Sequence, residues 1–145
     1  MTNMIQSAKD QVAALTQTAY ERAAAAGALP AGAEVRATIE IPKDTAHGDY
    51  ASSFAMAGAK ALHMAPRAIA QVIVDHLELE GSYFGKVEIA GPGFLNFTLG
   101  PKWYRDVLSA IETQGAGYGS GAGGAGKKVM VEFVSANPTG PMHMG

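Results

Sequence analysis

The stretch KVEIAGPGFLNFTL, residues 86–99, joins two apolar runs through a Gly-Pro-Gly sequence. KVEIA and FLNFTL are rich in strand-forming residues, and the sequence between them predicts a type II turn centred on Pro92 and Gly93. Two strands joined by so short a connection pair in the antiparallel sense. The stretch therefore predicts a β-hairpin, and with it a sheet that is at least partly antiparallel.

The segments around the hairpin show mainly helical patterns. Apolar residues recur every three or four positions in residues 3–26, and again in helices that begin at Pro66 and Pro101. The Ala-rich run at 50–64 is also expected to be helical, and VRATIEIP (35–42) is expected to form a strand. This order of elements predicts the α+β class, an antiparallel sheet with packed helices.

The composition excludes several classes of function. Of the 145 residues, 48% are hydrophobic and 17% are charged, which is enough for a globular core. The net charge of -2 provides no general attraction for nucleic acid, so any such contact must come from a local patch or from regions that this chain lacks. There is no cysteine, and the four histidines lack metal-ligand spacing, so no metal site is expected. Neither a signal peptide nor a membrane-spanning run is recognisable, and a cytoplasmic protein is expected.

A glycine-rich segment divides the chain into unequal parts. The helix before it carries its apolar residues on one side: Trp103, Val107, Leu108 and Ile111. Residues 115–126 read GAGYGSGAGGAG, a composition typical of a flexible linker. We therefore predict an N-terminal domain at 1–114, a linker at 115–127 and the start of another domain at 128–145.

The segment after the linker has a different character. KKVMVEFVS (127–135) is nearly continuous in apolar residues and predicts a strand buried on both faces, as in a parallel α/β sheet. SANPTGPMHMG (135–145) follows with many turn formers. Nucleotides bind at the carboxyl ends of such strands, where the next helix offers free N–H groups to phosphate. A lone His-x-Gly also fits an ordinary surface turn.

The tail as a whole resembles the first signature of class I aminoacyl-tRNA synthetases, the His-Ile-Gly-His region, in the form found in arginyl-tRNA synthetases. The residues that match are Glu132, Phe133, Ser135, Asn137, Pro138, Thr139, Gly140, Pro141, His143 and Gly145. Upstream, IEIPKDTAHGDYASSFAM, PRAIAQVIVDHL and VEIAGPGFLNFTL resemble the N-terminal additional domain of the bacterial enzymes. The resemblance implies a tRNA-binding domain followed by the first strand of a Rossmann-like catalytic domain, with the sequence ending inside the signature.

This resemblance implies an arginine–tRNA ligase, in which ATP with Mg²⁺ activates arginine to arginyl-adenylate before transfer to tRNA(Arg). His143 would stabilise charge on the reacting phosphate, and Gly145 would let ATP approach the backbone. Glu132, Ser135 and Asn137 match arginine-binding positions, although Glu132 also fits a solvent-facing strand residue and Asn137 a turn former. The implied ATP-binding signature comprises Ala136, Asn137, Pro138, Thr139, Gly140, Pro141, Met142, His143, Met144 and Gly145.

The hairpin offers a second, separate candidate site. Alternation places Leu95, Phe97 and Leu99 on one face of the strand, and Phe94, Asn96 and Thr98 on the other. An aromatic ring beside an amide suits an unstacked base, with Phe94 stacking and Asn96 hydrogen-bonding to the base edge. From alternation alone, a strand covered on both faces is the favoured explanation. The resemblance reverses that preference, because it implies that Phe94 and Asn96 contact the D-loop of the tRNA.

Two further expectations concern the HGD motif and the activity of the chain on its own. In HGD (47–49), Gly48 is expected to form a tight turn and Asp49 to cap the next helix. The chain is expected to be a monomeric fragment that is inactive alone, because most of a nucleotide-binding sheet is missing from it. The alternative is a free-standing RNA-binding module without catalysis, which would have no use for the tail.

Overall fold

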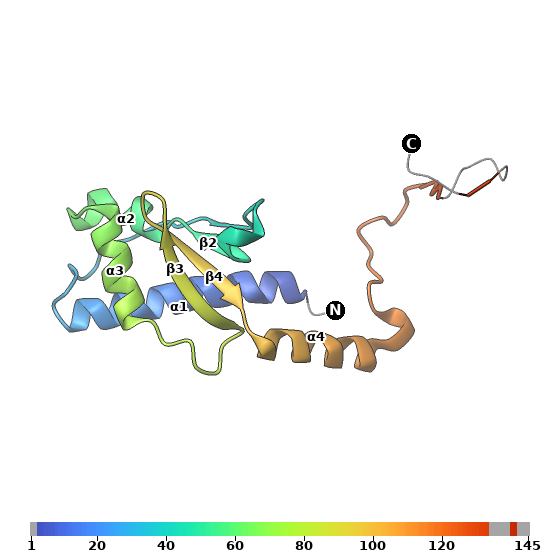
Figure 1. Ribbon diagram of the computed structural model, residues 1–145, viewed down its shortest axis with the longest axis horizontal. Helices are drawn as coiled ribbons and strands as arrows, with labels where there is room; N and C mark the ends of the chain where they lie inside the picture. The colour runs from blue at the N-terminus through green and yellow to red at the C-terminus, as the bar shows by residue number, and fades with distance from the viewer. Residues whose placement is uncertain (1–2, 134–139, 142–145) are drawn as a thin grey trace.

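The computed structural model describes residues 3–133 and 140–141. A four-stranded sheet packs against helices on one face, and a last helix extends from one end of the sheet (Figure 1). The α-helices are α1 (Met4–Ala25), α2 (Phe54–Leu62), α3 (Pro66–His76) and α4 (Pro101–Gln114). The strands are β1 (Ile39–Glu40), β2 (Tyr50–Ser52), β3 (Phe84–Ala90) and β4 (Phe94–Leu99), and the 3-10 helices are η1 (Thr45–His47) and η2 (Gly115–Gly117). The predicted α+β class with an antiparallel sheet is confirmed.

The sheet has the order β1-β2-β4-β3, and every neighbouring pair is antiparallel. β4 is therefore an inner strand that pairs with β3 through the predicted hairpin and with β2 from far along the sequence. The register places Asn96 opposite Ala51 of β2 and Glu88 of β3, and Phe97 opposite Tyr50 and Val87. Because side chains alternate along a strand, these two rows lie on opposite faces of the sheet.

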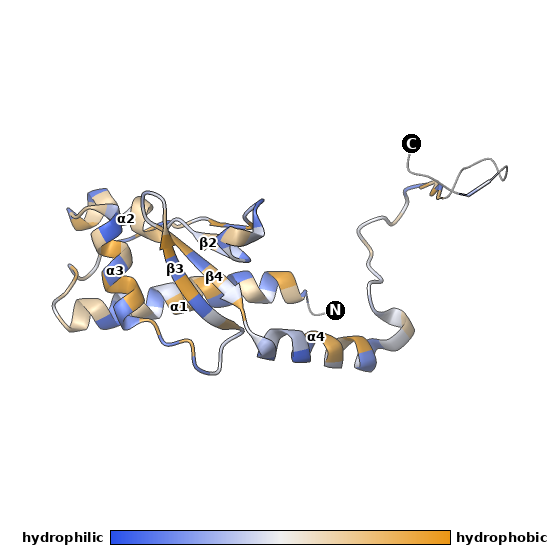
Figure 2. Cartoon of the chain, viewed as in Figure 1, coloured by the Kyte–Doolittle hydropathy of each residue, from blue (hydrophilic) through white to orange (hydrophobic). Residues whose placement is uncertain are grey.

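The core lies between one face of the sheet and the helices α1, α2 and α3. Leu95 and Phe97 of β4 are fully buried there, and the ring of Phe97 meets that of Phe84 edge-on at 5.4 Å. The hydropathy colouring shows hydrophobic segments alternating with hydrophilic ones along α1 and α3 (Figure 2). The α1 stripe recurs every three or four residues and consists of Ala8, Val12, Thr16, Ala19, Tyr20 and Ala23. Its small side chains allow α1 to pack closely on the rest of the core.

The helices predicted from periodicity are confirmed at nearly their predicted bounds. α1 begins where the Asn3 side chain accepts hydrogen bonds from the backbone N–H groups of Ile5 and Gln6, both at 3.1 Å. This interaction satisfies two of the free donors at a helix start. α3 begins at Pro66, in the first-turn position that proline favours, and buries Ile69 and Ile73.

Two local predictions are wrong. The start of the Ala-rich run, predicted as helix, forms β2, because its backbone pairs with both β1 and β4. The strand expected at 35–42 shortens to β1, two residues at the edge of the sheet. In both places long-range pairing, rather than the local sequence, determines the length of the element.

The hairpin turn also differs from the prediction. The backbone N–H of Gly93 donates to the carbonyl of Ala90 at 3.2 Å, which places Gly91 and Pro92 at the centre of the turn. Gly91 has a φ of 55°. A positive φ followed by a proline is the type II′ pattern, whose twist matches that of paired strands better than that of type II.

The C-terminal part of the described chain contributes little to the core. α4 buries no residue fully, and the apolar side predicted for it leaves Leu108 61% exposed. Residues 128–133 form no strand, and Met130 and Phe133 are 94% and 81% exposed. Over the described residues the predicted strand is therefore not formed, because an isolated strand has no neighbour to hydrogen-bond with. Among the described residues, no helix is long and apolar enough to cross a membrane.

Candidate functional site

The face of the sheet turned away from the helices carries a hollow of about 520 Å³. No residue of α1 to α4 lines it. The strands and the hairpin turn contribute Glu40, Ala51, Ala90, Gly91, Pro92, Phe94 and Asn96, and the segment before β2 contributes Pro42, Lys43, Asp44 and His47. The alternative explanation from alternation alone, a strand covered by a helix on this face too, therefore does not hold for the described residues. Phe94 and Asn96, singled out from the sequence, lie together in this hollow.

Asn96 is one of the residues that line the hollow. The residue is 7% exposed, and among the described residues its side chain has no hydrogen-bond partner. Its neighbours across the sheet are Ala51 and Glu88, and the small Ala51 leaves space beside it. A carboxamide carries two donor hydrogens and an acceptor oxygen. The amide is therefore available to a polar ligand that enters the hollow.

Phe94 is the first residue of β4, and the turn before it is firmly anchored. The guanidinium of Arg67 donates to the carbonyl of Gly91 at 2.7 Å. Gly93 has a φ of 141°, and an added Cβ would lie 3.0 Å from the Cβ of Pro66. These contacts hold the turn against the start of α3. The partly buried ring of Phe94 is thus held beside Asn96 at a fixed position.

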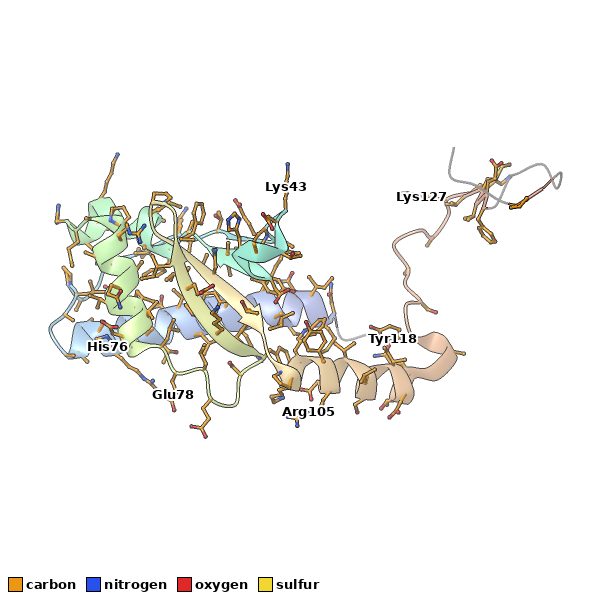
Figure 3. The ribbon with its side chains drawn as sticks, viewed as in Figure 1. Lys43, His76, Glu78, Arg105, Tyr118 and Lys127 are labelled. Carbon is orange, nitrogen blue, oxygen red and sulfur yellow. The ribbon has the colours of Figure 1, made fainter. Side chains whose placement is uncertain are left out.

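The opposite wall is the segment from Lys43 to His47, which precedes β2. Asp44 accepts a hydrogen bond from the backbone N–H of Ala46 at 2.9 Å, which stabilises η1. Both Lys43 and His47 are exposed, and Figure 3 shows Lys43 projecting outward from this segment. The sequence interpretation missed these residues as part of the site. The one signal was the HGD motif, which was read as structural.

Gly48 and Asp49 attach this wall to β4. Gly48 has a φ of 80°, and an added Cβ would lie 2.9 Å from the carbonyl oxygen of Phe97, so the predicted tight turn is confirmed. The N–H of Asp49 donates to the same carbonyl at 2.9 Å, and the N–H of Leu99 donates to the Asp49 carboxylate at 2.8 Å. The prediction that Asp49 caps a helix is wrong. The β-pairing of the next residues turns its side chain toward β4 instead.

Acidic side chains outnumber basic ones around the hollow. The lining includes the carboxylates of Glu40 and Asp44 and the ammonium group of Lys43. On the covered face, burial and, to a smaller extent, the negative charge of Asp49 raise the pKa of Tyr50 above its ordinary value of 10.0. The Tyr50 phenol therefore stays neutral at physiological pH and belongs to the core.

The three tail candidates that the structure describes, Glu132, Gly140 and Pro141, do not line this hollow. Glu132 is exposed, and Gly140 and Pro141 are described and also exposed. The other tail residues named above lie outside the described residues: Ser135, Ala136, Asn137, Pro138, Thr139, Met142, His143, Met144 and Gly145. Within the described part of the chain, no group of three His, Cys, Asp or Glu side chains could hold a metal ion.

Comparison with known proteins identifies the family. The model of the family described as "Arginyl tRNA synthetase N terminal domain" matches residues 6–99. The chain belongs to this family. The match runs from α1 to the end of β4, so it includes the hollow and stops before α4. The resemblance inferred from the sequence is thereby confirmed.

Relatives of the arginyl-tRNA synthetase family extend beyond the matched domain. The "Arginine--tRNA ligase" of Acetivibrio thermocellus is 44% identical over 145 residues, which is 100% of this chain and 26% of the relative. That of Nitrobacter hamburgensis is 49% identical over 120 residues, 82% of this chain and 20% of the relative. The chain thus spans about a quarter of the length of the curated relatives it matches.

A solved structure supports the fold. The crystal structure of arginyl-tRNA synthetase from Plasmodium falciparum matches with a TM-score of 0.55 over 70% of this chain and 18% of that chain. The sequence identity is 14%, so this likeness concerns the fold alone. Together with the family match, it agrees with the α+β arrangement described above.

Proposed function

We propose that this chain is the tRNA-contacting N-terminal part of an arginine–tRNA ligase. The family match over residues 6–99 supports the assignment, and so do relatives of that name that align along the entire chain, tail included. A free-standing RNA-binding module would explain the folded domain but not a tail that resembles a class I signature. The single observation that supports a binding role is the unpartnered amide of Asn96 beside Phe94 in the open hollow.

The hollow suits one unstacked base of a tRNA loop, which we propose to be a D-loop nucleotide. Base stacking on an aromatic side chain contributes about 1–3 kcal/mol and tolerates different bases. Phe94 supplies this aromatic surface, and Asn96 supplies hydrogen bonds to the base edge. An amide that lines the hollow favours ligands that complete its hydrogen bonds.

The chemical step of the proposed ligase belongs to the tail and to sequence beyond it. We propose that arginine, ATP with Mg²⁺ and tRNA(Arg) are the substrates, and that the protein acts in the cytoplasm. Glu132, Ser135 and Asn137 would hold arginine, as their match to the family positions implies. His143 would donate a hydrogen bond to the phosphate where charge develops, and Gly145 would allow close approach of ATP. These roles require the rest of the catalytic domain, so the chain alone should not form arginyl-adenylate.

The test compares variants of the ligase that contains this segment. Asn96→Ala should raise the KM for tRNA roughly fivefold, which corresponds to about 1 kcal/mol for a lost hydrogen bond. The KM values for arginine and ATP should stay unchanged. Phe94→Ala should weaken tRNA binding by about 1–3 kcal/mol, roughly 5- to 150-fold in Kd. Thr98→Ala is the control, because Thr98 lies on the same face of β4 but outside the hollow. Unchanged tRNA kinetics in both site variants would rule out this role for the hollow.

A further inference from the structure

The proposed base-binding role accounts for Phe94 and Asn96 but not for the wall opposite them. A nucleotide held by its base still carries its sugar and phosphates at the mouth of the hollow. Phosphate contacts from Lys or Arg supply affinity and fix orientation, while base contacts supply selectivity. The inference below rests on the proposed function and concerns the group that makes the phosphate contact.

The segment that bears Lys43 is built to keep a fixed place relative to β4. Gly48 packs so closely on the Phe97 carbonyl that no side chain fits there, and Asp49 forms two hydrogen bonds with β4. Asp44 stabilises the turn directly after Lys43. The wall is therefore attached to the same strand that presents the stacking ring and the amide. The backbone of this wall therefore keeps its place relative to the base site, and the exposed Lys43 side chain is ordered only when it binds a ligand.

Lys43 is the one Lys or Arg among the described residues that line the hollow. Its ammonium group takes part in no salt bridge among the described residues, and the side chain projects to solvent at the rim (Figure 3). The two nearest alternatives are engaged, since Lys86 pairs with Glu88 at 2.8 Å and Arg67 holds the hairpin turn. The neighbouring Glu40 carboxylate would repel a phosphate unless a cation offsets it.

We propose that Lys43 contacts the phosphate of the nucleotide whose base enters the hollow. Base recognition and backbone recognition are then divided between the two walls. Phe94 and Asn96 bind the base, while Lys43 binds the sugar–phosphate backbone that passes over the rim. In a chain of net charge -2, and beside the carboxylates of Glu40 and Asp44, the ammonium group of Lys43 is the one positive charge that the described lining offers to a phosphate.

The test is the salt dependence of tRNA(Arg) affinity, measured with the ligase that contains this segment. Each phosphate contact to a single-stranded region makes the plot of log K against log salt steeper by about 0.7. Losing one contact therefore makes the negative slope shallower by about 0.7. Lys43→Ala should show this shallower slope, so its affinity deficit should shrink roughly fivefold over a tenfold rise in salt. Lys43→Arg should retain the original slope. The matched control is Lys60→Ala, an exposed lysine near the end of α2 and outside the hollow, which should also retain it.

The same series separates this inference from the proposed function. If Phe94→Ala and Asn96→Ala weaken binding while Lys43→Ala keeps the original slope, the assignment of Lys43 is wrong and the base site stands. An equal loss of slope in Lys60→Ala would also overturn it, because the effect would then be general surface charge. If neither Phe94→Ala nor Asn96→Ala changes affinity, the proposed function fails and the Lys43 inference fails with it.

Discussion

The two faces of β4 differ in what covers them. On one face, Leu95 and Phe97 are fully buried beneath the helices. On the other, Asn96 is almost as inaccessible, yet it is enclosed by residues of the sheet and its loops and adjoins an open hollow. Low exposure on an inner strand thus has two causes. Helix packing makes one face a core, and sheet neighbours with a small residue at Ala51 make the other a site.

The covered face should determine stability. Phe97→Ala removes a fully buried ring that meets Phe84 edge-on and lies opposite Tyr50. We expect a loss of about 3–5 kcal/mol in the free energy of unfolding, from lost burial and from the cavity left behind. Urea denaturation of the chain measures it, with Thr98→Ala as the same-strand control. A loss below about 1 kcal/mol would mean that this face is not the core.

The second-largest loss of stability is expected at Gly48, where the segment before β2 packs on β4. Gly48→Ala forces a side chain into a positive φ and places its Cβ 2.9 Å from the Phe97 carbonyl oxygen. Gly48 has a φ of 80° and a ψ of -170°, a region that essentially only glycine adopts and that costs other residues roughly 1–3 kcal/mol, and the steric conflict adds to it. Gly27→Ala is the matched control, because its φ is 77° and an added Cβ meets nothing within 4 Å. Equal losses in the two variants would contradict the close attachment of the wall to β4.

The smallest effect concerns pH and the covered face. Burial raises the pKa of Tyr50, so the folded state keeps this proton to a higher pH than the unfolded state does. The resulting stabilisation is complete below the unfolded value near 10.0 and is lost as pH rises through the folded value. Tyr50→Phe should therefore reduce the alkaline loss of stability above about pH 10. The measurement compares the denaturation midpoints of the unsubstituted chain and of Tyr50→Phe as the pH rises. If both midpoints fall by the same amount, Tyr50 is not shielded from water.

The elements predicted correctly are those whose sequence pattern is local. α1, α3 and the hairpin each carry their periodicity or turn residues within one segment, so the sequence alone defines them. β2 has no such pattern, because three residues beside an Ala-rich helix become a strand only through pairing with β1 and β4. The apolar side of α4 was predicted as well. No local pattern indicates whether another element covers that side, and in the structure Leu108 is exposed.

The candidate site was predicted only in part for the same reason. Phe94 and Asn96 lie on one strand, where alternation places them on a common face. Lys43 and His47 reach the hollow through the antiparallel register of β2 and β4, which joins segments about fifty residues apart in the sequence. The tail residues depend on a sheet whose other strands this chain does not supply, so their proposed roles still rest on resemblance.

The most direct test of the account is to map where RNA contacts the folded domain. Amide chemical shifts of the chain should be followed while a hairpin RNA with the D-loop sequence of tRNA(Arg) is added. We expect the shifts to change around the hollow, in residues 40–51 and 90–96, and to stay unchanged on α1 and α4. Changes concentrated on the exposed side of α4 would contradict the claim that the open face of β4 is the binding surface.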